Sequence, residues 1–153
     1  MNINLIKIKK MDIDDVNILT NTFSEFDDFW NSNIFKSDFE QNNSYYIVAK
    51  SQEGEIIGFA GMKIFINEAD IMNIATKKIY RNIRIGSLIL KNLLEIAKNL
   101  GLSTITLEVN EKNNIAIKLY KKFNFEIIGK RKKYYNNQFD AIIMQKKLIT
   151  NRQ

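Results

Sequence analysis

The chain has 153 residues, of which 45% are hydrophobic and 26% charged, a balance typical of a globular protein rather than a disordered or fibrous one. It contains no cysteine and no histidine, which excludes disulfides and zinc–thiolate sites and removes the commonest general base. No metal site is therefore expected, and acid–base chemistry would depend on Glu, Asp, Tyr, Lys or water. No apolar run approaches the roughly 20 residues of a membrane helix, so no membrane partner is expected.

The charge is divided unevenly along the chain. Residues 1–70 carry 6 Lys/Arg and 12 Asp/Glu, a net charge of −6, whereas residues 71–153 carry 17 and 5, a net charge of +12. A basic half suggests a polyanionic ligand, either nucleic acid or a phosphorylated cofactor, and an acidic half suits a cationic substrate. Because the length is that of one domain and no linker or repeat is present, a single domain over residues 1–153 is expected.

The N-terminal half predicts a helical segment among strands. The stretch "MNINLIKIKK" alternates apolar and polar residues, which predicts a strand near residues 3–9 and not a signal peptide. Acidic helical material follows over about 12–40. Strands are then expected at "SYYIVAK" (44–50) and "EIIGFAGMKIF" (55–65), joined by a turn around Gly54, and at "EADIMNIATKKI" (68–79).

The C-terminal half predicts two helices between strands. Residues 86–100 form a helix, ended by Gly101, whose apolar stripe is Leu90, Leu93, Leu94, Ala97 and Leu100. "STITLEVN" (103–110) predicts a strand and "NNIAIKLYKKF" (113–123) a helix. "FEIIGKRKKYY" (125–135) and "AIIMQKKLI" (141–149) predict a closing strand pair around Asn136 and Asn137. Strands in a run with two helical crossovers predict an α/β or α+β sheet with a parallel central pair.

The stretch "YRNIRIGSLIL" (80–90) indicates an anion site where a strand passes into a helix. The start of a helix has unpaired N–H groups, Gly86 permits close approach, and Arg81 and Arg84 add positive charge. The stretch has neither the lysine of a P-loop nor the glycines of a dinucleotide fingerprint. A plain capped surface turn is the alternative interpretation.

Four blocks occur in a characteristic order: "NIAT" (73–76), Arg81-x-x-x-x-Gly86, "LEVNEKNNIAIKLYKKFNF" (107–125) and "KKYYNNQFDAIIM" (132–144). In this the chain resembles the GCN5-related N-acetyltransferases (GNAT), and among them the bacterial ribosomal-protein alanine N-acetyltransferases, over about residues 40–148. The resemblance implies a mixed, mostly antiparallel central sheet flanked by helices, with a parallel pair at the cofactor cleft. It further implies acetyl-CoA as cosubstrate, a protein or peptide N-terminus as acceptor, such as that of a ribosomal protein, and a cytoplasmic location.

The resemblance also implies roles for individual residues. The turn from Asn82 to Ser87 would wrap the pyrophosphate of acetyl-CoA, and residues 74–76 would offer backbone groups to its pantetheine arm. Glu108 matches the general base of the family and Tyr120 its general acid. The residues expected to bind the cofactor are Ile74, Ala75, Thr76, Arg81, Asn82, Ile83, Arg84, Ile85, Gly86, Ser87 and Asn113.

The residue types agree with these two catalytic roles without establishing them. In a strand over 103–110, Glu108 lies on the face opposite Ile105 and Leu107; the alternative is that this face is turned to solvent. A free α-amino group titrates at roughly 7.7–8.0, so a carboxylate is a sufficient base, and a thiol at ~8.5 can take a proton from a tyrosine at ~10. Tyr120 could also simply fill the core beside Phe123.

The chain departs from the family pattern at two glycine positions. Arg84 stands where the family has glycine, and a left-handed backbone there would cost roughly 1 kcal/mol. Asn124 replaces the glycine after the second helix, which is a mild change because asparagine tolerates that conformation.

Three functions are compatible with the sequence: a protein N-terminal acetyltransferase, an acetyltransferase of a small amine such as a polyamine or an amino sugar, and a non-catalytic basic module that binds nucleic acid. The segment 20–42 and the hairpin 132–140 would distinguish the first two, because they would line the amine site. The third would bind RNA or DNA in a salt-sensitive manner. No recognised nucleic-acid motif is present, so nucleic acid is not expected as a partner.

Overall fold

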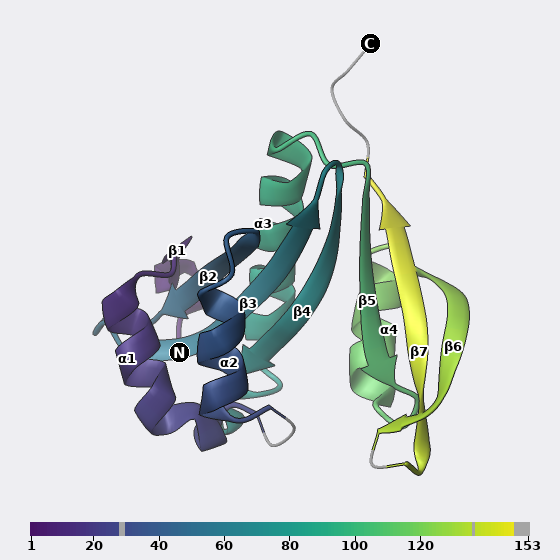
Figure 1. The fold of residues 1–153 in the computed structure, drawn as a ribbon. Coiled ribbons are helices and arrows are strands. Elements are labelled where there is room, and N and C mark those ends of the chain that lie inside the picture. Colours follow the sequence, from purple (N-terminus) through teal and green to yellow (C-terminus); the bar gives the residue numbers. More distant parts are fainter. Residues whose placement is uncertain (28–29, 136, 149–153) are drawn as a thin grey trace. The chain divides into compact units, whose positions relative to one another are not determined.

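The computed structural model describes residues 1–27, 30–135 and 137–148. The chain divides into two compact units, of which the first is Met1–Ile64 with Met72–Ile96 and the second is Phe65–Ile71 with Ala97–Gln153. Strand β4 and helix α3 each belong partly to both. Figure 1 shows the helices and strands of both units.

The first unit is an antiparallel set of strands with helices on its faces. Strand β1 pairs with β2 and β2 with β3, each in antiparallel register. The short 3₁₀ turns are η1 (Ile3–Leu5), η2 (Phe23–Glu25) and η3 (Lys78–Tyr80). The longer elements are β1 (Lys7–Lys10), α1 (Ile13–Thr22), α2 (Ser32–Phe39), β2 (Ser44–Lys50), β3 (Ile56–Phe65), β4 (Glu68–Thr76) and α3 (Ile85–Asn99).

The first residues differ from the strand expected near 3–9. The side chain of Asn2 accepts a hydrogen bond from the Asn4 N–H at 3.0 Å, and the Leu5 N–H donates to the Asn2 carbonyl at 3.0 Å. These local bonds form η1, so the strand is confined to Lys7–Lys10. The acidic segment that follows is helical as expected, and Asp12 and Asp15 cap the start of α1 reciprocally.

Opposite faces of β3 carry different layers of the first unit. Phe59 packs against Phe23, Phe26 and Phe35, with ring centroids 5.8, 5.6 and 5.4 Å away, so the helical segment covers this face with aromatic rings. On the other face lies Gly58, where an added Cβ would come within 2.5 Å of Ile89 in α3. The absent side chain at Gly58 therefore lets α3 lie close against the sheet.

Helix α3 confirms most of the predicted apolar stripe. Leu90, Leu93, Leu94 and Ala97 are buried. The expectation for Leu100 is wrong, because the helix ends at Asn99 and the Leu100 side chain is 51% exposed. Gly101 reverses the chain with φ +78°, and its N–H donates to the Lys98 carbonyl at 3.0 Å.

The second unit contains the parallel strand pair. Strand β4 pairs in parallel with β5, with Glu68 opposite Thr104 and Asp70 opposite Thr106. Strand β7 pairs antiparallel with both β5 and β6. The elements are β5 (Thr104–Asn110), α4 (Asn114–Lys122), β6 (Glu126–Tyr135) and β7 (Phe139–Lys147).

Together the pairings give a seven-stranded mixed sheet in the order β1-β2-β3-β4-β5-β7-β6. Strands β4 and β5 run in parallel, since α3 provides the crossover between them. The predicted mixed, mostly antiparallel sheet flanked by helices is confirmed. The closing strand pair was expected around Asn136 and Asn137: Asn136 lies outside the described residues, and Asn137 has a left-handed φ of 56°.

Candidate active site

The turn before α3 has the backbone geometry of an anion site. Asn82 and Arg84 both have left-handed backbones, with φ 70° and 69°, and the residues between η3 and α3 are exposed. The helix begins at Ile85, and its first internal bond runs from the Leu88 N–H to the Arg84 carbonyl at 3.1 Å. The N–H groups of Ile85, Gly86 and Ser87 therefore have no acceptor within the helix and are available to an anion.

The side chain of Arg81 stabilises this turn through two hydrogen bonds. Its Nη2 donates to the Phe26 carbonyl at 2.8 Å and its Nε to the Thr76 carbonyl at 3.4 Å, so one guanidinium joins the end of β4 to the segment between α1 and α2. Both are bonds to neutral backbone oxygens, so the positive charge is not neutralised. The cofactor contact expected of Arg81 stays a prediction.

A charged cluster that sequence analysis missed supports η3, the segment leading into the turn. Lys77 Nζ lies 2.7 Å from Glu55 Oε2 and 3.4 Å from Glu25 Oε1, and the Tyr80 hydroxyl donates to Glu55 Oε1 at 2.9 Å. The hydrogen bond with Lys77 lowers the pKa of Glu55, and the same bond raises the pKa of Lys77. No sequence signal reveals this cluster, because its contacting pairs lie 22 to 52 positions apart, and the bond from the Lys77 N–H to the Ile57 carbonyl holds Lys77 beside the start of β3, next to Glu55.

The end of β4 holds Ile74, Ala75 and Thr76. Ala75 is buried, whereas Ile74 and Thr76 are partly exposed. The Lys77 N–H donates to the Ile57 carbonyl at 2.8 Å, which ties the chain just beyond the strand to β3. Nearby, the Asn73 amide donates to Asp27 Oδ2 at 3.1 Å, a second link between β4 and the α1–α2 segment. The backbone expected to contact pantetheine is therefore held on both sides.

Glu108 lies on the less buried face of β5. Ile105, Leu107 and Val109 are buried, as the alternation predicts, while the Glu108 side chain on the opposite face is 27% exposed. Its Oε1 lies 2.9 Å from Nη2 of Arg131 on β6. The carboxylate is thus accessible to water and paired with a cation. The sequence analysis did not foresee this pairing.

Asn113 lies at the start of α4, and Tyr120 lies within the helix. Asn113 is the N-cap, and its side-chain oxygen accepts from the Ala116 N–H at 3.1 Å, so its amide NH₂ is the part that could contact a ligand. Tyr120 is 6% exposed, and its ring meets Phe125 edge-on with centroids 5.7 Å apart. The structure therefore shows the packing role of Tyr120; its role as general acid stays a prediction.

The structure places the expected site residues in two sets. The turn 81–87 and residues 74–76 belong to the first unit, and Glu108, Asn113 and Tyr120 belong to the second. At the two positions where the family has glycine, both Arg84 and Asn124 (φ 69°) have left-handed backbones. Over the described part of the chain, no helix is long and apolar enough to cross a membrane, and no group of three or more His, Cys, Asp or Glu side chains could hold a metal ion.

Comparison with known proteins identifies the family. Residues 15–125 match the acetyltransferase (GNAT) family. A Bacillus subtilis (strain 168) protein named as a candidate ribosomal protein bS18-alanine N-acetyltransferase is 33% identical over 122 residues, which cover 79% of this chain and 81% of that protein. The ribosomal protein bS18-alanine N-acetyltransferase of Escherichia coli (strain K12) is 31% identical over 118 residues, covering 75% and 78%.

The fold leads to the same family. The crystal structure of the ribosomal-protein-S18-alanine N-acetyltransferase from Escherichia coli superposes with a TM-score of 0.88, at 25% identity and over 97% of both chains. The resemblance inferred from the four sequence blocks is thereby confirmed. The chain belongs to the acetyltransferase (GNAT) family and is an N-acetyltransferase.

Proposed function

We propose that the protein transfers the acetyl group of acetyl-CoA to the N-terminal α-amine of a protein, and that the acceptor is the N-terminal alanine of ribosomal protein bS18. The observation that carries the proposal is the 33% and 31% identity to two bacterial proteins named for that reaction, over about three quarters of this chain. A cytoplasmic location follows from the same proposal, because ribosomal proteins are made there.

The residues of the turn suit the phosphates of acetyl-CoA. Two left-handed residues and the free N–H groups at the start of α3 form a backbone site for an anion, and the exposed Arg84 adds a positive charge. In the proposal Asn82, Ile83 and Arg84 bind the pyrophosphate together with residues 85–87, residues 74–76 bind pantetheine, and the Asn113 amide contacts the cofactor. Bound acetyl-CoA supplies an acetyl thioester that an amine attacks directly.

Two residues of the second unit would move the protons. An α-amine titrates at roughly 7.7–8.0 and is mostly an ammonium ion at neutral pH, so Glu108 accepts its proton, directly or through a water molecule. Tyr120 would donate a proton to the departing thiolate, which needs no large pKa shift because a thiol (~8.5) is more acidic than a phenol (~10). We further propose that the two units act as one N-acetyltransferase domain, since the family match spans residues of both.

A thermal-unfolding experiment tests the cofactor part of the proposal without any knowledge of the acceptor. Acetyl-CoA at ~100 times its Kd adds ~2.7 kcal/mol to the unfolding free energy and should raise Tm by several degrees. A short RNA serves as the comparison. Stabilisation by RNA and none by millimolar acetyl-CoA would contradict the proposal and favour a nucleic-acid module.

An acetylation assay tests the acceptor. Synthetic peptides beginning with alanine should be acetylated, and the same peptides with a blocked N-terminus should not. Because the protein has no cysteine, a thiol reagent measures the released coenzyme A without background from the protein. Acetylation of spermidine or an amino sugar, with the peptides untouched, would replace the protein acceptor by a small amine.

A further inference from the structure

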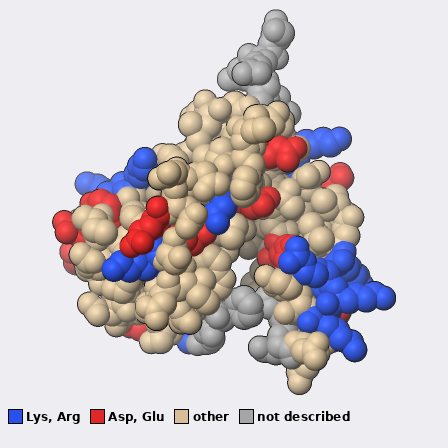
Figure 2. Space-filling model, in the orientation of Figure 1, with Lys and Arg blue, Asp and Glu red and all other residues tan. Residues whose placement is uncertain are grey.

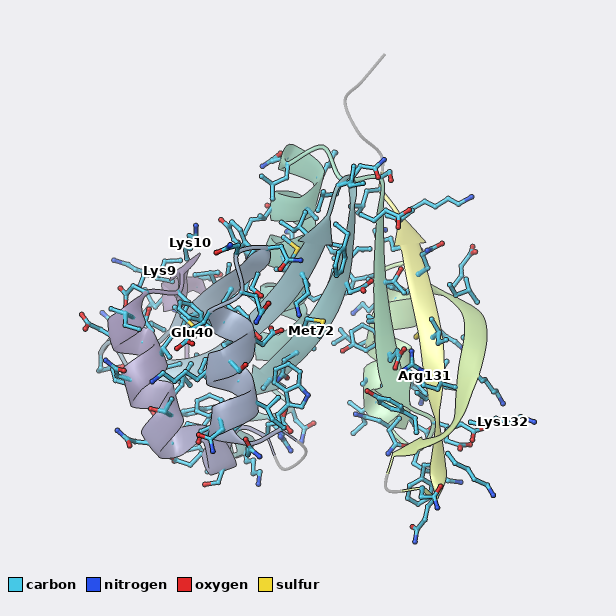
Figure 3. The ribbon with its side chains drawn as sticks, in the orientation of Figure 1. Lys9, Lys10, Glu40, Met72, Arg131 and Lys132 are labelled. Carbon is cyan, nitrogen blue, oxygen red and sulfur yellow. The ribbon has the colours of Figure 1, made fainter. Side chains whose placement is uncertain are left out.

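The ion pair between Glu108 and Arg131 spans a strand. Glu108 lies opposite Ile143 of β7, whereas Arg131 lies opposite Ala141 of the same strand, so the guanidinium reaches diagonally over β7. The small side chain of Ala141 leaves a path for this reach. Figure 3 shows Arg131 directed across the strands toward β5 and the adjacent Lys132 directed away from the sheet.

Few contacts hold the Arg131 side chain in its pair with Glu108. Its side chain is 56% exposed, and its guanidinium carbon lies 5.0 Å from the centroid of the Tyr134 ring, a contact that does not require Glu108. Strand β6 is irregular here, with a register shift between Arg131 and Tyr135 and a left-handed φ of 51° at Lys133. Exposed ion pairs are worth about 0.2–1 kcal/mol, so opening this one costs little.

The pair blocks the carboxylate that the reaction needs. A guanidinium keeps its proton at any physiological pH, so it can occupy Glu108 without reacting. The acceptor also arrives as a cation, since an α-amine is mostly protonated near pH 7. Exchanging one cation for another leaves the carboxylate compensated throughout, whereas a neutral acceptor would have to open the pair and leave the charge without a partner.

We propose that Arg131 is a displaceable counter-ion, a positioning residue that keeps Glu108 paired until the ammonium of the acceptor takes its place. The proposal rests on the function assigned to Glu108 above. On displacement, the guanidinium keeps its contact with Tyr134 and turns to solvent, and one proton passes from the ammonium nitrogen to the Glu108 carboxylate. The products of that step are a neutral amine and a carboxylic acid, which later releases its proton to water.

Arg131→Gln should therefore bind the acceptor more tightly, because nothing has to be displaced. We expect KM and Kd for an alanine-first peptide to fall by about 1.4- to 5-fold, the range given by an exposed pair, with kcat within about 2-fold of the parent. Arg131→Lys, which restores a cation, should return both constants toward the parent values. Arg131→Met is the second variant if the glutamine disturbs the sheet.

Lys132→Gln is the matched control for charge. The second unit carries 12 Lys/Arg and 6 Asp/Glu, and its exposed Lys130, Lys132 and Lys133 give the hairpin a positive field that repels any cationic peptide (Figure 2). Lys132→Gln removes the same charge from that field without touching Glu108. An equal fall of KM in Arg131→Gln and Lys132→Gln would show general charge repulsion and contradict the counter-ion proposal.

A double-mutant cycle with Glu108→Gln separates this proposal from the proposed function. The effect of Arg131→Gln on Kd should disappear when Glu108 is already glutamine. If Glu108→Gln keeps full activity, Glu108 is not the base and the proposed mechanism fails. If Glu108→Gln is nearly inactive while Arg131→Gln leaves Kd unchanged or only lowers kcat, the proposed function stands and only the counter-ion proposal is wrong.

Discussion

Two carboxylates of this protein are paired with cations but differ in burial. Asp15 in the first unit is 1% exposed, and its oxygens lie 2.8 Å from Lys9 Nζ and 2.8 Å from Lys50 Nζ. It also accepts the Asp12 N–H at 3.0 Å. Glu108 in the second unit is 27% exposed and pairs with Arg131, whose side chain is itself 56% exposed.

The difference in burial determines what each pair can do. A buried carboxylate that loses its cations becomes an uncompensated charge in a medium of low polarity, so the Asp15 pairs stay closed and fix the start of α1 against β1 and β2. A partly exposed carboxylate can exchange one partner for another or for water at little cost. A carboxylate–cation pair is therefore a structural bond at Asp15, whereas at Glu108 it leaves the carboxylate able to serve as the proposed base.

The largest expected effect comes from removing the available carboxylate. Glu108→Gln should lower kcat/KM by about 10²–10⁴-fold, the usual contribution of a general base, and change the pH–rate profile. The unfolding free energy should change by less than about 1 kcal/mol, because the lost pair is exposed, and acetyl-CoA affinity should stay nearly constant. Initial rates and thermal unfolding measure both quantities. A large loss of stability without loss of rate would show that Glu108 is a structural carboxylate like Asp15 and not the base.

Removing the cations around the buried carboxylate should affect stability instead. The double variant Lys9→Met, Lys50→Met leaves Asp15 buried without a cation, which should cost about 3–5 kcal/mol of unfolding free energy at pH 7. Denaturant unfolding measures this loss, and Arg131→Met is the control, since it removes the cation beside Glu108 and should cost less than about 1 kcal/mol.

The pH dependence of that loss checks its cause. Burial alone would raise the pKa of Asp15, but hydrogen bonds from Lys50 and Lys9 lower it below the ordinary value of 3.8. In the parent protein the stabilisation is thus present above about pH 4 and lost as pH falls through the lowered folded pKa. Without the lysines, burial raises the pKa and protonation relieves the cost. The stability difference should therefore shrink as pH falls from 7 toward 4; a constant difference would contradict the account.

Local signals in the sequence predicted the fold better than the site. The alternation in 103–110 predicted the faces of β5 because side chains alternate with period two, and the family glycine at position 84 indicated where a left-handed backbone could occur, as it does at Arg84. The pairing of Glu108 with Arg131 could not be predicted, since it depends on the order β5-β7-β6 and on two registers. The exposed Leu100 was missed for a local reason, because the helix ends one residue earlier than its apolar pattern.

The smallest expected effect concerns Arg84, a cation whose left-handed backbone carries a cost in stability. Its left-handed backbone costs about 1 kcal/mol relative to glycine, offset in part because glycine loses more entropy on folding. Arg84→Gly should therefore change stability by less than about 1 kcal/mol. If the guanidinium meets the pyrophosphate, the same change should weaken acetyl-CoA binding by about 2- to 13-fold, the range that corresponds to the net ~0.5–1.5 kcal/mol of one hydrogen bond.

Arg84→Lys separates charge from backbone, because it keeps the cation and the Cβ and alters only the head group. Calorimetric titration should give this variant an acetyl-CoA Kd close to that of the parent. If Arg84→Gly binds as tightly as the parent, the backbone N–H groups at the start of α3 hold the phosphates without help. The turn would then depend on its backbone alone, in contrast to the side-chain chemistry at Glu108.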